Sequence, residues 1–196
     1  MTPLSDDFRG LNEYHLVVQA DDDVHHKVSE EKQVFSVLYR QKIAVKTKPH
    51  ITLANFMARE EMEETLIRWI ERVSSRQRSF PVTLNNYSGF PEHTIYLRVQ
   101  DHLPFQQLAG QLKVIDSYVR SNGCPIVKLS YHPHLSIARR LPGDVYEKAL
   151  VDYSQKMFCE SFTVQELVLL RRAHQFDSCK VVNIFRLLPG ENNLVN

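Results

Sequence analysis

The chain has 196 residues, of which 43% are hydrophobic and 24% charged, as in soluble globular proteins long enough to bury a core. Its 24 Lys and Arg residues nearly balance 23 Asp and Glu residues, and the net charge of +1 argues against extended nonspecific binding to duplex DNA. Three scattered cysteines, Cys124, Cys159 and Cys179, match neither a disulfide framework nor a zinc motif. No segment resembles a signal peptide or a membrane span, so we expect a cytoplasmic protein without membrane contact.

The first part of the chain predicts alternating strands and helices. Residues 13–21 have an apolar, β-branched centre and predict a strand, and residues 24–41 carry apolar residues at near-helical spacing. Residues 48–56, "KPHITLANF", predict a second strand. Residues 60–76 predict a helix, because acidic residues fill the first turn and arginines the last, which complements the helix dipole.

The remaining segments continue the alternation. A helix is expected to start near Pro104 and to stop at Gly123, and another to start at an Asp144 N-cap and run to about Phe158. Strands are expected at 79–90, 93–100, 131–140, 161–172 and 180–188.

Matching landmarks recur along the chain at an offset of 81 to 84 residues. The pairs are Gln19 with Gln100, His50 with His134, and Ser79-Phe80 with Ser161-Phe162. Because the expected elements also recur in the same order, we infer an internal duplication. The predicted fold is α+β and bilobal: two similar β/α lobes around a central cleft, with residues 1–196 forming a single two-lobed domain.

Each repeat contains one His-x-Thr/Ser motif in an apolar frame. The first is Pro49-His50-Ile51-Thr52-Leu53, and the second is Pro133-His134-Leu135-Ser136-Ile137. Side chains alternate between the two faces of a strand, so each histidine shares a face with its hydroxyl residue while the apolar residues point to the other face. The two polar pairs are therefore expected to face each other across the cleft.

Two imidazoles and two hydroxyls suit phosphodiester chemistry that needs no metal. One neutral histidine can take a proton from water while the other, protonated, donates to the leaving oxygen. Histidine suits both roles because its ordinary pKa of about 6.5 makes both protonation states accessible near neutrality. The hydroxyls of Thr52 and Ser136 can donate hydrogen bonds to the nonbridging phosphate oxygens.

With these paired motifs, "PHITL" and "PHLSIAR", the sequence resembles the two-histidine phosphoesterases, in the branch of bacterial RNA 2′,3′-cyclic phosphodiesterases, also called 2′-5′ RNA ligases. The resemblance spans nearly the whole chain. It implies that His50 and His134 are catalytic, that Thr52 and Ser136 bind phosphate, and that Arg139 occupies a position where this branch often has an arginine. It also implies a 2′-phosphate product and no cofactor.

Other interpretations stay open for several of these residues. A single histidine on a strand is usually structural, and His132 shares the parity of His134, so His50, His132 and His134 could form a metal site. Phe56 shares the strand parity of His50 and could stack a base at the edge of the cleft, as could Tyr131, although a packing role is equally compatible with the sequence. Arg139 could steer an anionic substrate or simply be solvated.

The sequence therefore predicts an enzyme that hydrolyses 2′,3′-cyclic phosphates at RNA ends or on nucleotides. The alternatives are 2′-5′ RNA ligase activity, a phosphoesterase for another small cyclic phosphodiester such as an ADP-ribose cyclic phosphate, and a non-catalytic module that binds RNA ends. A monomer is the default expectation.

Overall fold

Every strand in the described part of the chain belongs to one antiparallel sheet. The structure is a computed structural model that describes residues 10–91, 93–173 and 177–190. The sheet has the strand order β7-β3-β4-β6-β2-β1-β8-β9, and the short strand β5 pairs with β2. The strands are β1 (Leu11–Val18), β2 (Ile51–Arg59), β3 (Phe80–Phe90), β4 (Thr94–Val99), β5 (Lys128–Leu129), β6 (His134–Ala138), β7 (Cys159–Val164), β8 (Glu166–Arg172) and β9 (Lys180–Arg186).

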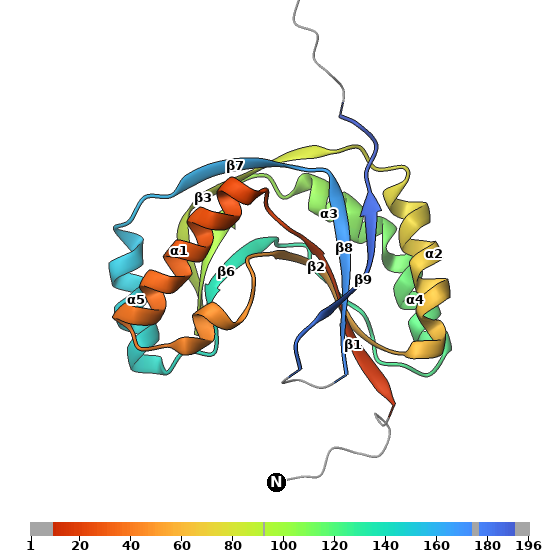
Figure 1. The fold of residues 1–196 in the computed structure, drawn as a ribbon, viewed down its shortest axis with the longest axis horizontal. Coiled ribbons are helices and arrows are strands. Elements are labelled where there is room, and N and C mark those ends of the chain that lie inside the picture. Colours follow the sequence, from red (N-terminus) through yellow and green to blue (C-terminus); the bar gives the residue numbers. More distant parts are fainter. Residues whose placement is uncertain (1–9, 92, 174–176, 191–196) are drawn as a thin grey trace, which may run out of the picture.

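Helices cover the two ends of this sheet (Figure 1). They are α1 (Asp22–Leu38), α2 (Glu63–Ser74), α3 (Leu103–Gln111), α4 (Lys113–Ser121) and α5 (Gly143–Ser154), with 3-10 turns η2 (Lys42–Lys46) and η3 (Glu60–Met62). Helices α1 and α5 pack on the half formed by β7, β3, β4 and β6. Helices α2 and α3 pack on the half formed by β2, β1, β8 and β9, and α4 packs on both of these helices. The expected α+β fold with two β/α parts is confirmed, and the internal duplication remains a prediction.

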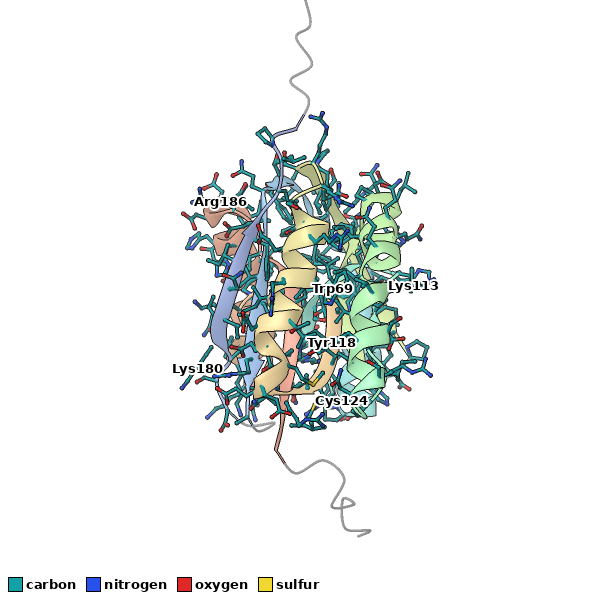
Figure 2. All side chains as sticks on the ribbon, turned by 90° about the vertical axis from the view of Figure 1, so that its right-hand side faces the viewer. Trp69, Lys113, Tyr118, Cys124, Lys180 and Arg186 are labelled. Atoms are coloured by element: carbon teal, nitrogen blue, oxygen red, sulfur yellow. The ribbon has the colours of Figure 1, made fainter. Side chains whose placement is uncertain are left out.

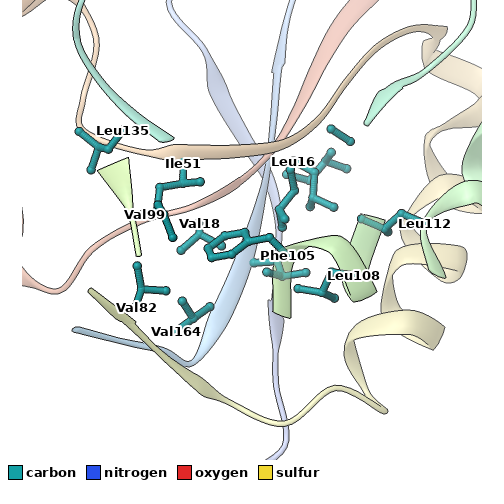
Figure 3. Close-up of a cluster of buried hydrophobic side chains, with 14 of the residues drawn as sticks. Leu16, Val18, Ile51, Val82, Val99, Phe105, Leu108, Leu112, Leu135 and Val164 are labelled. Carbon is teal, nitrogen blue, oxygen red and sulfur yellow. The ribbon is translucent and has the colours of Figure 1, made fainter. Parts of the chain in front are cut away.

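The apolar residues of both motifs lie in the hydrophobic core. Ile51 and Leu135 are 0% and 1% exposed and are paired with each other across β2 and β6. Phe105 and Leu108 of α3 belong to the same cluster (Figure 3). Burying an aliphatic side chain stabilises a fold by roughly 1.5–3 kcal/mol. The core therefore fixes the backbone of both motif strands.

Most expected boundaries differ from the structure by a few residues, and three differences change an element or its cap. The helix expected after Pro104 divides at Leu112 into α3 and α4. The expected Asp144 N-cap is wrong, because α5 begins at Gly143 after Pro142, which leaves Asp144 in the first turn. The strand expected over 161–172 divides at Gln165, because β7 pairs with β3 in one half of the sheet and β8 pairs with β1 in the other.

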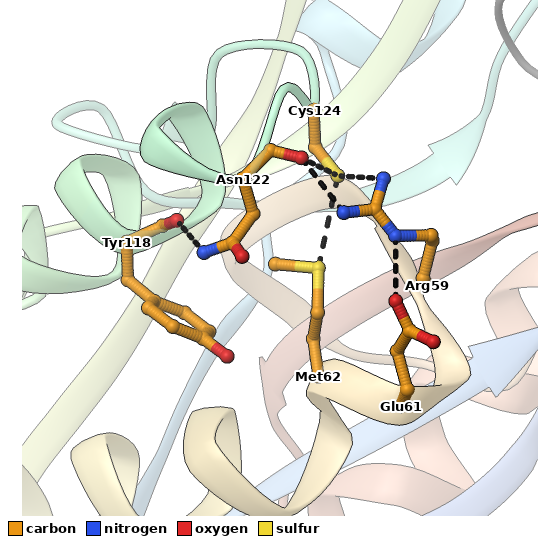
Figure 4. Close-up of polar contacts among 6 residues, drawn as sticks. All are labelled: Arg59, Glu61, Met62, Tyr118, Asn122 and Cys124. Carbon is orange, nitrogen blue, oxygen red and sulfur yellow. Dashed lines mark hydrogen bonds and ion pairs between the residues drawn. The ribbon is translucent and has the colours of Figure 1, made fainter.

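A polar cluster anchors the end of β2 that lies away from the motif (Figure 4). The Arg59 guanidinium donates through Nη2 to the Asn122 carbonyl at 2.8 Å and through Nε to Glu61 Oε1 at 2.9 Å. Asn122 is the C-cap of α4. The strand that follows His50 is thus fixed at its far end to a helix. Cys124 is buried beside Met62, and all three cysteines are free thiols.

The outer surface of one half is formed by α2 and α4, which lie side by side (Figure 2). Trp69 of α2 is partly buried against the core, and the Arg72 guanidinium lies 5.6 Å from its ring centroid. Lys113 at the start of α4 is exposed. None of the helices in the described ranges combines the length and hydropathy that a membrane span needs.

Candidate active site

The two motifs lie on adjacent strands and line one cavity. His50 directly precedes β2, and His134 begins β6. The two strands are antiparallel and are paired through Ile51 and Leu135, the central residues of the motifs. Two residues from each motif line a cavity of about 320 Å³; these are His50, Thr52, His134 and Ser136. Residues that are 84 positions apart in the sequence therefore meet at one site.

Both histidines are oriented by the same kind of hydrogen bond. His50 Nδ1 lies 2.8 Å from the Lys48 carbonyl oxygen, and His134 Nδ1 lies 3.1 Å from the His132 carbonyl oxygen. A carbonyl can only accept, so each Nδ1 carries the hydrogen and each neutral ring has its lone pair on Nε2. In both cases the carbonyl belongs to the residue before the motif proline. This arrangement makes Nε2 the atom for proton transfer in both rings.

A β-bulge lies at the last residue of each motif. On β2, Val17 pairs with Thr52 and Leu16 with Ala54, so Leu53 is the extra residue. On β6, Tyr96 pairs with Ser136 and Ile95 with Ala138, so the extra residue there is Ile137. A bulge inserts one residue and reverses which face the following side chains occupy. The residues that join the motif face after the bulges are Asn55 and Arg139, and both line the cavity.

The bulge in β2 corrects the expectation for Phe56. Strict alternation would place this ring on the face of His50 and Thr52. After the extra residue it points into the core instead: Phe56 is 1% exposed and stacks on Tyr14 with ring centroids 5.3 Å apart. It borders a neighbouring cavity, but its ring is not available to stack a base.

Asn55, and not Phe56, lines the cavity that contains the two motifs, and the sequence analysis did not predict it. Its Nδ2 donates to Glu13 Oε1 at 2.9 Å and lies 3.0 Å from His15 Nδ1. One feature of the sequence could have indicated the bulges. The last residue of each motif is followed by a second apolar residue, which gives the pairs Leu53-Ala54 and Ile137-Ala138, and these interrupt the polar–apolar alternation of a regular strand.

The remaining candidates fall in different places. Arg139 lines the cavity directly after β6, as expected for a residue that contacts an anionic substrate. Tyr131 is 37% exposed and does not line any of the described cavities. The aromatic residues beside the site are Phe90 and Tyr96, whose ring centroids lie 4.9 Å and 5.2 Å from that of His134.

The cavity is strongly basic although the whole chain is nearly neutral. Its lining includes four cationic side chains, Lys32, Lys48, Lys128 and Arg139, and the described residues that line it include no carboxylate. The short strand β5 brings in Lys128, which is paired with Asn55. Such a cavity favours an anionic ligand.

The same environment keeps both histidines neutral at pH 7. The pKa of His50 is lowered to about 4, mainly by burial and also by the positive charges of Arg139 and Lys32, against the opposing effect of the Lys48 carbonyl. Burial also lowers the pKa of His134. A phosphate between them would raise both pKa values, because an opposite charge favours the protonated ring. Ligand binding would thus favour protonation of an imidazole by solvent, which gives the acid that catalysis requires.

The alternative metal site of His50, His132 and His134 is not formed. Within the described ranges, no three His, Cys, Asp or Glu side chains are grouped closely enough to hold a metal ion. His132 is exposed and packs against His102, with ring centroids 6.0 Å apart.

Comparison with known families identifies this arrangement. The family model described as the 2′-5′ RNA ligase superfamily matches residues 22–175, which include both motifs and all of the cavity lining. The chain belongs to the 2′-5′ RNA ligase superfamily. The superfamily comprises phosphoesterases and ligases, as the resemblance of the paired motifs implied.

Solved structures share the superfamily fold. TT0787 of Thermus thermophilus has a TM-score of 0.70 at 17% identity, covering 89% of this chain and 97% of its own. E. coli LigT complexed with 3′-AMP has a TM-score of 0.63 at 17% identity, covering 90% and 98%. A protein described only as a phosphoesterase has a TM-score of 0.61 at 18% identity, covering 90% and 99%. The sequence has no significant match among curated proteins.

Proposed function

We propose that this protein hydrolyses 2′,3′-cyclic phosphates, at RNA ends or on nucleotides, to 2′-phosphates by two-histidine acid/base catalysis. The observation that carries the proposal is the pair of equivalent His–hydroxyl motifs on adjacent strands, lining one basic cavity. The E. coli LigT structures of similar fold contain 3′-AMP, ATP or NADP+, which supports a nucleotide as the ligand.

In the proposed reaction, Nε2 of one neutral histidine accepts a proton from water as the water oxygen bonds to phosphorus. The phosphorus–O3′ bond breaks, and the second histidine, protonated, donates its Nε2 proton to O3′. The products are a 2′-phosphate and a 3′-hydroxyl. Thr52 and Ser136 hydroxyls donate to the nonbridging oxygens, where negative charge is concentrated. For 2′-5′ ligation, a 5′-hydroxyl would take the place of water.

The acid and base in this scheme are both side chains of the protein, so no proton transfer requires a metal. Each proton-transfer residue typically contributes about 10²–10⁴-fold to the rate. We therefore expect His50→Ala and His134→Ala each to lower kcat/KM by about that factor. Thr52→Val should cost about 10²-fold, as the loss of one oxyanion hydrogen bond does, and Thr52→Ser should retain most activity.

The test is hydrolysis of 2′,3′-cyclic nucleotides and of an oligonucleotide ending in a cyclic phosphate, in EDTA, with 2′- and 3′-phosphate products resolved. A 2′-phosphate product that persists in EDTA and is lost in both histidine variants is the expected result. His26→Ala, on the exposed surface of α1, is the matched control and should retain full activity. No turnover of any of these substrates would overturn the proposal and favour a binding module or another phosphodiester. A joined 2′-5′ product from substrates with a 5′-hydroxyl would add ligation.

A further inference from the structure

Lys32 is a charged residue on the buried face of α1, where the spacing of the other buried residues predicts an apolar side chain. The buried residues of α1 are Val24, Val28, Lys32 and Phe35, which recur at helical spacing along one face. Lys32 is 3% exposed, one of only two buried polar or charged residues among those described. A buried ammonium group loses its hydration, and this loss is compensated only when a strong partner is present.

The contacts of Lys32 provide only part of that compensation. Its Nζ donates to the Thr47 carbonyl and, at 3.1 Å, to Thr47 Oγ1. Both acceptors are neutral, and an ammonium group has three hydrogens to donate. Within the described ranges no carboxylate forms an ion pair with Lys32, whereas exposed Lys27 of the same helix pairs with Glu160 at 2.8 Å. Burial, followed by the charge of Arg139, lowers the pKa of Lys32 to about 8.

The surroundings of Lys32 show where a counter-charge would come from. Lys32 and Thr47 both line the cavity that contains His50 and His134. The charge of Lys32 is close enough to lower the pKa of His50. The other charged residues in the lining, Lys48, Lys128 and Arg139, are also cationic, and the charge of Arg139 acts on Lys32. Only a ligand in the cavity would complete this arrangement with an anion.

We propose that the buried ammonium group of Lys32, held by Thr47 beside His50, is a binding group for the substrate phosphate. This inference rests on the proposed function in that the cavity accepts a phosphate. It adds a cation from α1 to the motif residues of β2 and β6. Because the ammonium group is already fixed by Thr47, it contributes its charge without losing side-chain freedom on binding.

The competing explanation is that Lys32 only tethers Thr47, and with it the segment leading to His50. The two roles predict opposite effects on stability. Lys32→Met keeps the length of the side chain and removes the charge. If Lys32 binds phosphate, this variant should be at least as stable as wild type, because an incompletely compensated buried charge has been replaced by an apolar group. If Lys32 is a tether, the variant should be less stable.

The experiment measures inorganic phosphate binding by calorimetry at pH 7 in EDTA, together with the free energy of unfolding. We expect Lys32→Met to bind phosphate about 10- to 100-fold more weakly than wild type, as the loss of one charge-assisted hydrogen bond implies. Lys32→Gln, which can still donate to Thr47, should show the same loss. The control is Lys113→Met, which removes the same charge from exposed α4 (Figure 2) and should change neither quantity.

Several results would overturn the inference: unchanged phosphate affinity in both neutral variants, no measurable phosphate binding by wild type, or two neutral variants that do not fold. Turnover is measured separately. Phosphate binding that depends on Lys32 without cyclic-phosphate hydrolysis would contradict the proposed function and leave the Lys32 inference standing. Hydrolysis with normal phosphate binding in both variants would contradict the Lys32 inference alone.

Discussion

The two histidines are alike in their hydrogen bonds and differ in their surroundings. Each donates Nδ1–H to the carbonyl two residues before it. His50 lies among Arg139, Lys32 and His15, whose charges oppose its protonation, whereas His134 packs against the rings of Phe90 and Tyr96. For both, burial is the largest cause of a lowered pKa. In the proposed reaction, a site that disfavours imidazolium until an anion binds would couple acid catalysis to substrate binding.

This environment makes the stability of the fold depend on pH. With a pKa of about 4 in the folded protein and an ordinary value of about 6.5 in the unfolded chain, His50 binds a proton more readily when unfolded. Unfolding is therefore favoured as pH falls from about 6.5 to about 4, by roughly 2–3 kcal/mol for this residue alone. Above pH 7 the contribution disappears, because both states are neutral.

We expect His50→Asn to reduce this pH dependence, since asparagine does not titrate. Denaturant unfolding at pH 7 and pH 4.5 measures the difference between wild type and variant. His26→Asn, whose side chain is 75% exposed on α1, serves as the control and should keep the wild-type pH dependence. Equal pH dependence in wild type and His50→Asn would show that the His50 pKa is not lowered by the fold.

Among the elements, the bulged strands β2 and β6 decide which side chains reach the cavity. Leu53 and Ile137 are the extra residues, and each shifts the following residues to the opposite face. Bulges often re-aim side chains next to active sites. Here they add an amide, Asn55, to one motif and a guanidinium, Arg139, to the other. Two motifs of the same pattern thereby form a site with different chemistry at its two ends.

The β3–β4 hairpin packs closely against α5 at Gly89. A Cβ at this position would lie 2.6 Å from Tyr146 Oη and 2.8 Å from Leu150 Cδ1. Both side chains would have to move, so we expect Gly89→Ala to destabilise the protein by about 1–3 kcal/mol. Activity should also fall, because the neighbouring residue Phe90 packs on His134.

Gly110→Ala is the matched control for this prediction. A Cβ at Gly110 in α3 would meet nothing within 4 Å, and alanine favours helix, so this change should stabilise the protein by about 0.5–1 kcal/mol. Denaturant unfolding measures both variants. A Gly89→Ala protein as stable as wild type would show that the ends of the Tyr146 and Leu150 side chains can move aside at little cost.

At the scale of the whole molecule, charge is distributed unevenly. The chain carries 24 basic and 23 acidic residues, yet the cavity lining combines four cations with no carboxylate among the described residues. Acidic side chains lie elsewhere, for example Glu63, which pairs with Arg171 on β8. The net charge of the chain is therefore near zero, although the cations of the cavity produce a local field that attracts anions into the site.

This field should make substrate binding depend on salt. Raising NaCl from about 50 to about 300 mM shortens the Debye length to well below about 10 Å, so we expect KM for a cyclic nucleotide to rise several-fold while kcat changes little. Steady-state kinetics at constant pH measures the effect. Lys128→Gln should have a weaker salt dependence, and Lys113→Met the same dependence as wild type. A KM that does not respond to salt would indicate that the cations of the lining do not act on the substrate.

The sequence by itself determined which residues form the two motifs and the coarse order of elements. His50, Thr52, His134 and Ser136 could be found because local alternation and a repeated pattern need no knowledge of distant contacts. The sequence predicted that the two motifs face each other, but the antiparallel pairing of β2 with β6, which brings them together, is known only from the sheet order.

Tertiary structure alone decided what surrounds the motifs. The exchange of Phe56 for Asn55 follows from a bulge, and a bulge is a feature of pairing between two strands that neither strand specifies locally. Likewise, the sequence did not show that Lys32 is buried beside the cavity, and its proposed role depends on that position. Local patterns specify which face a side chain occupies while the strand stays regular. Charge and burial at the site depend on segments that meet only in the folded protein.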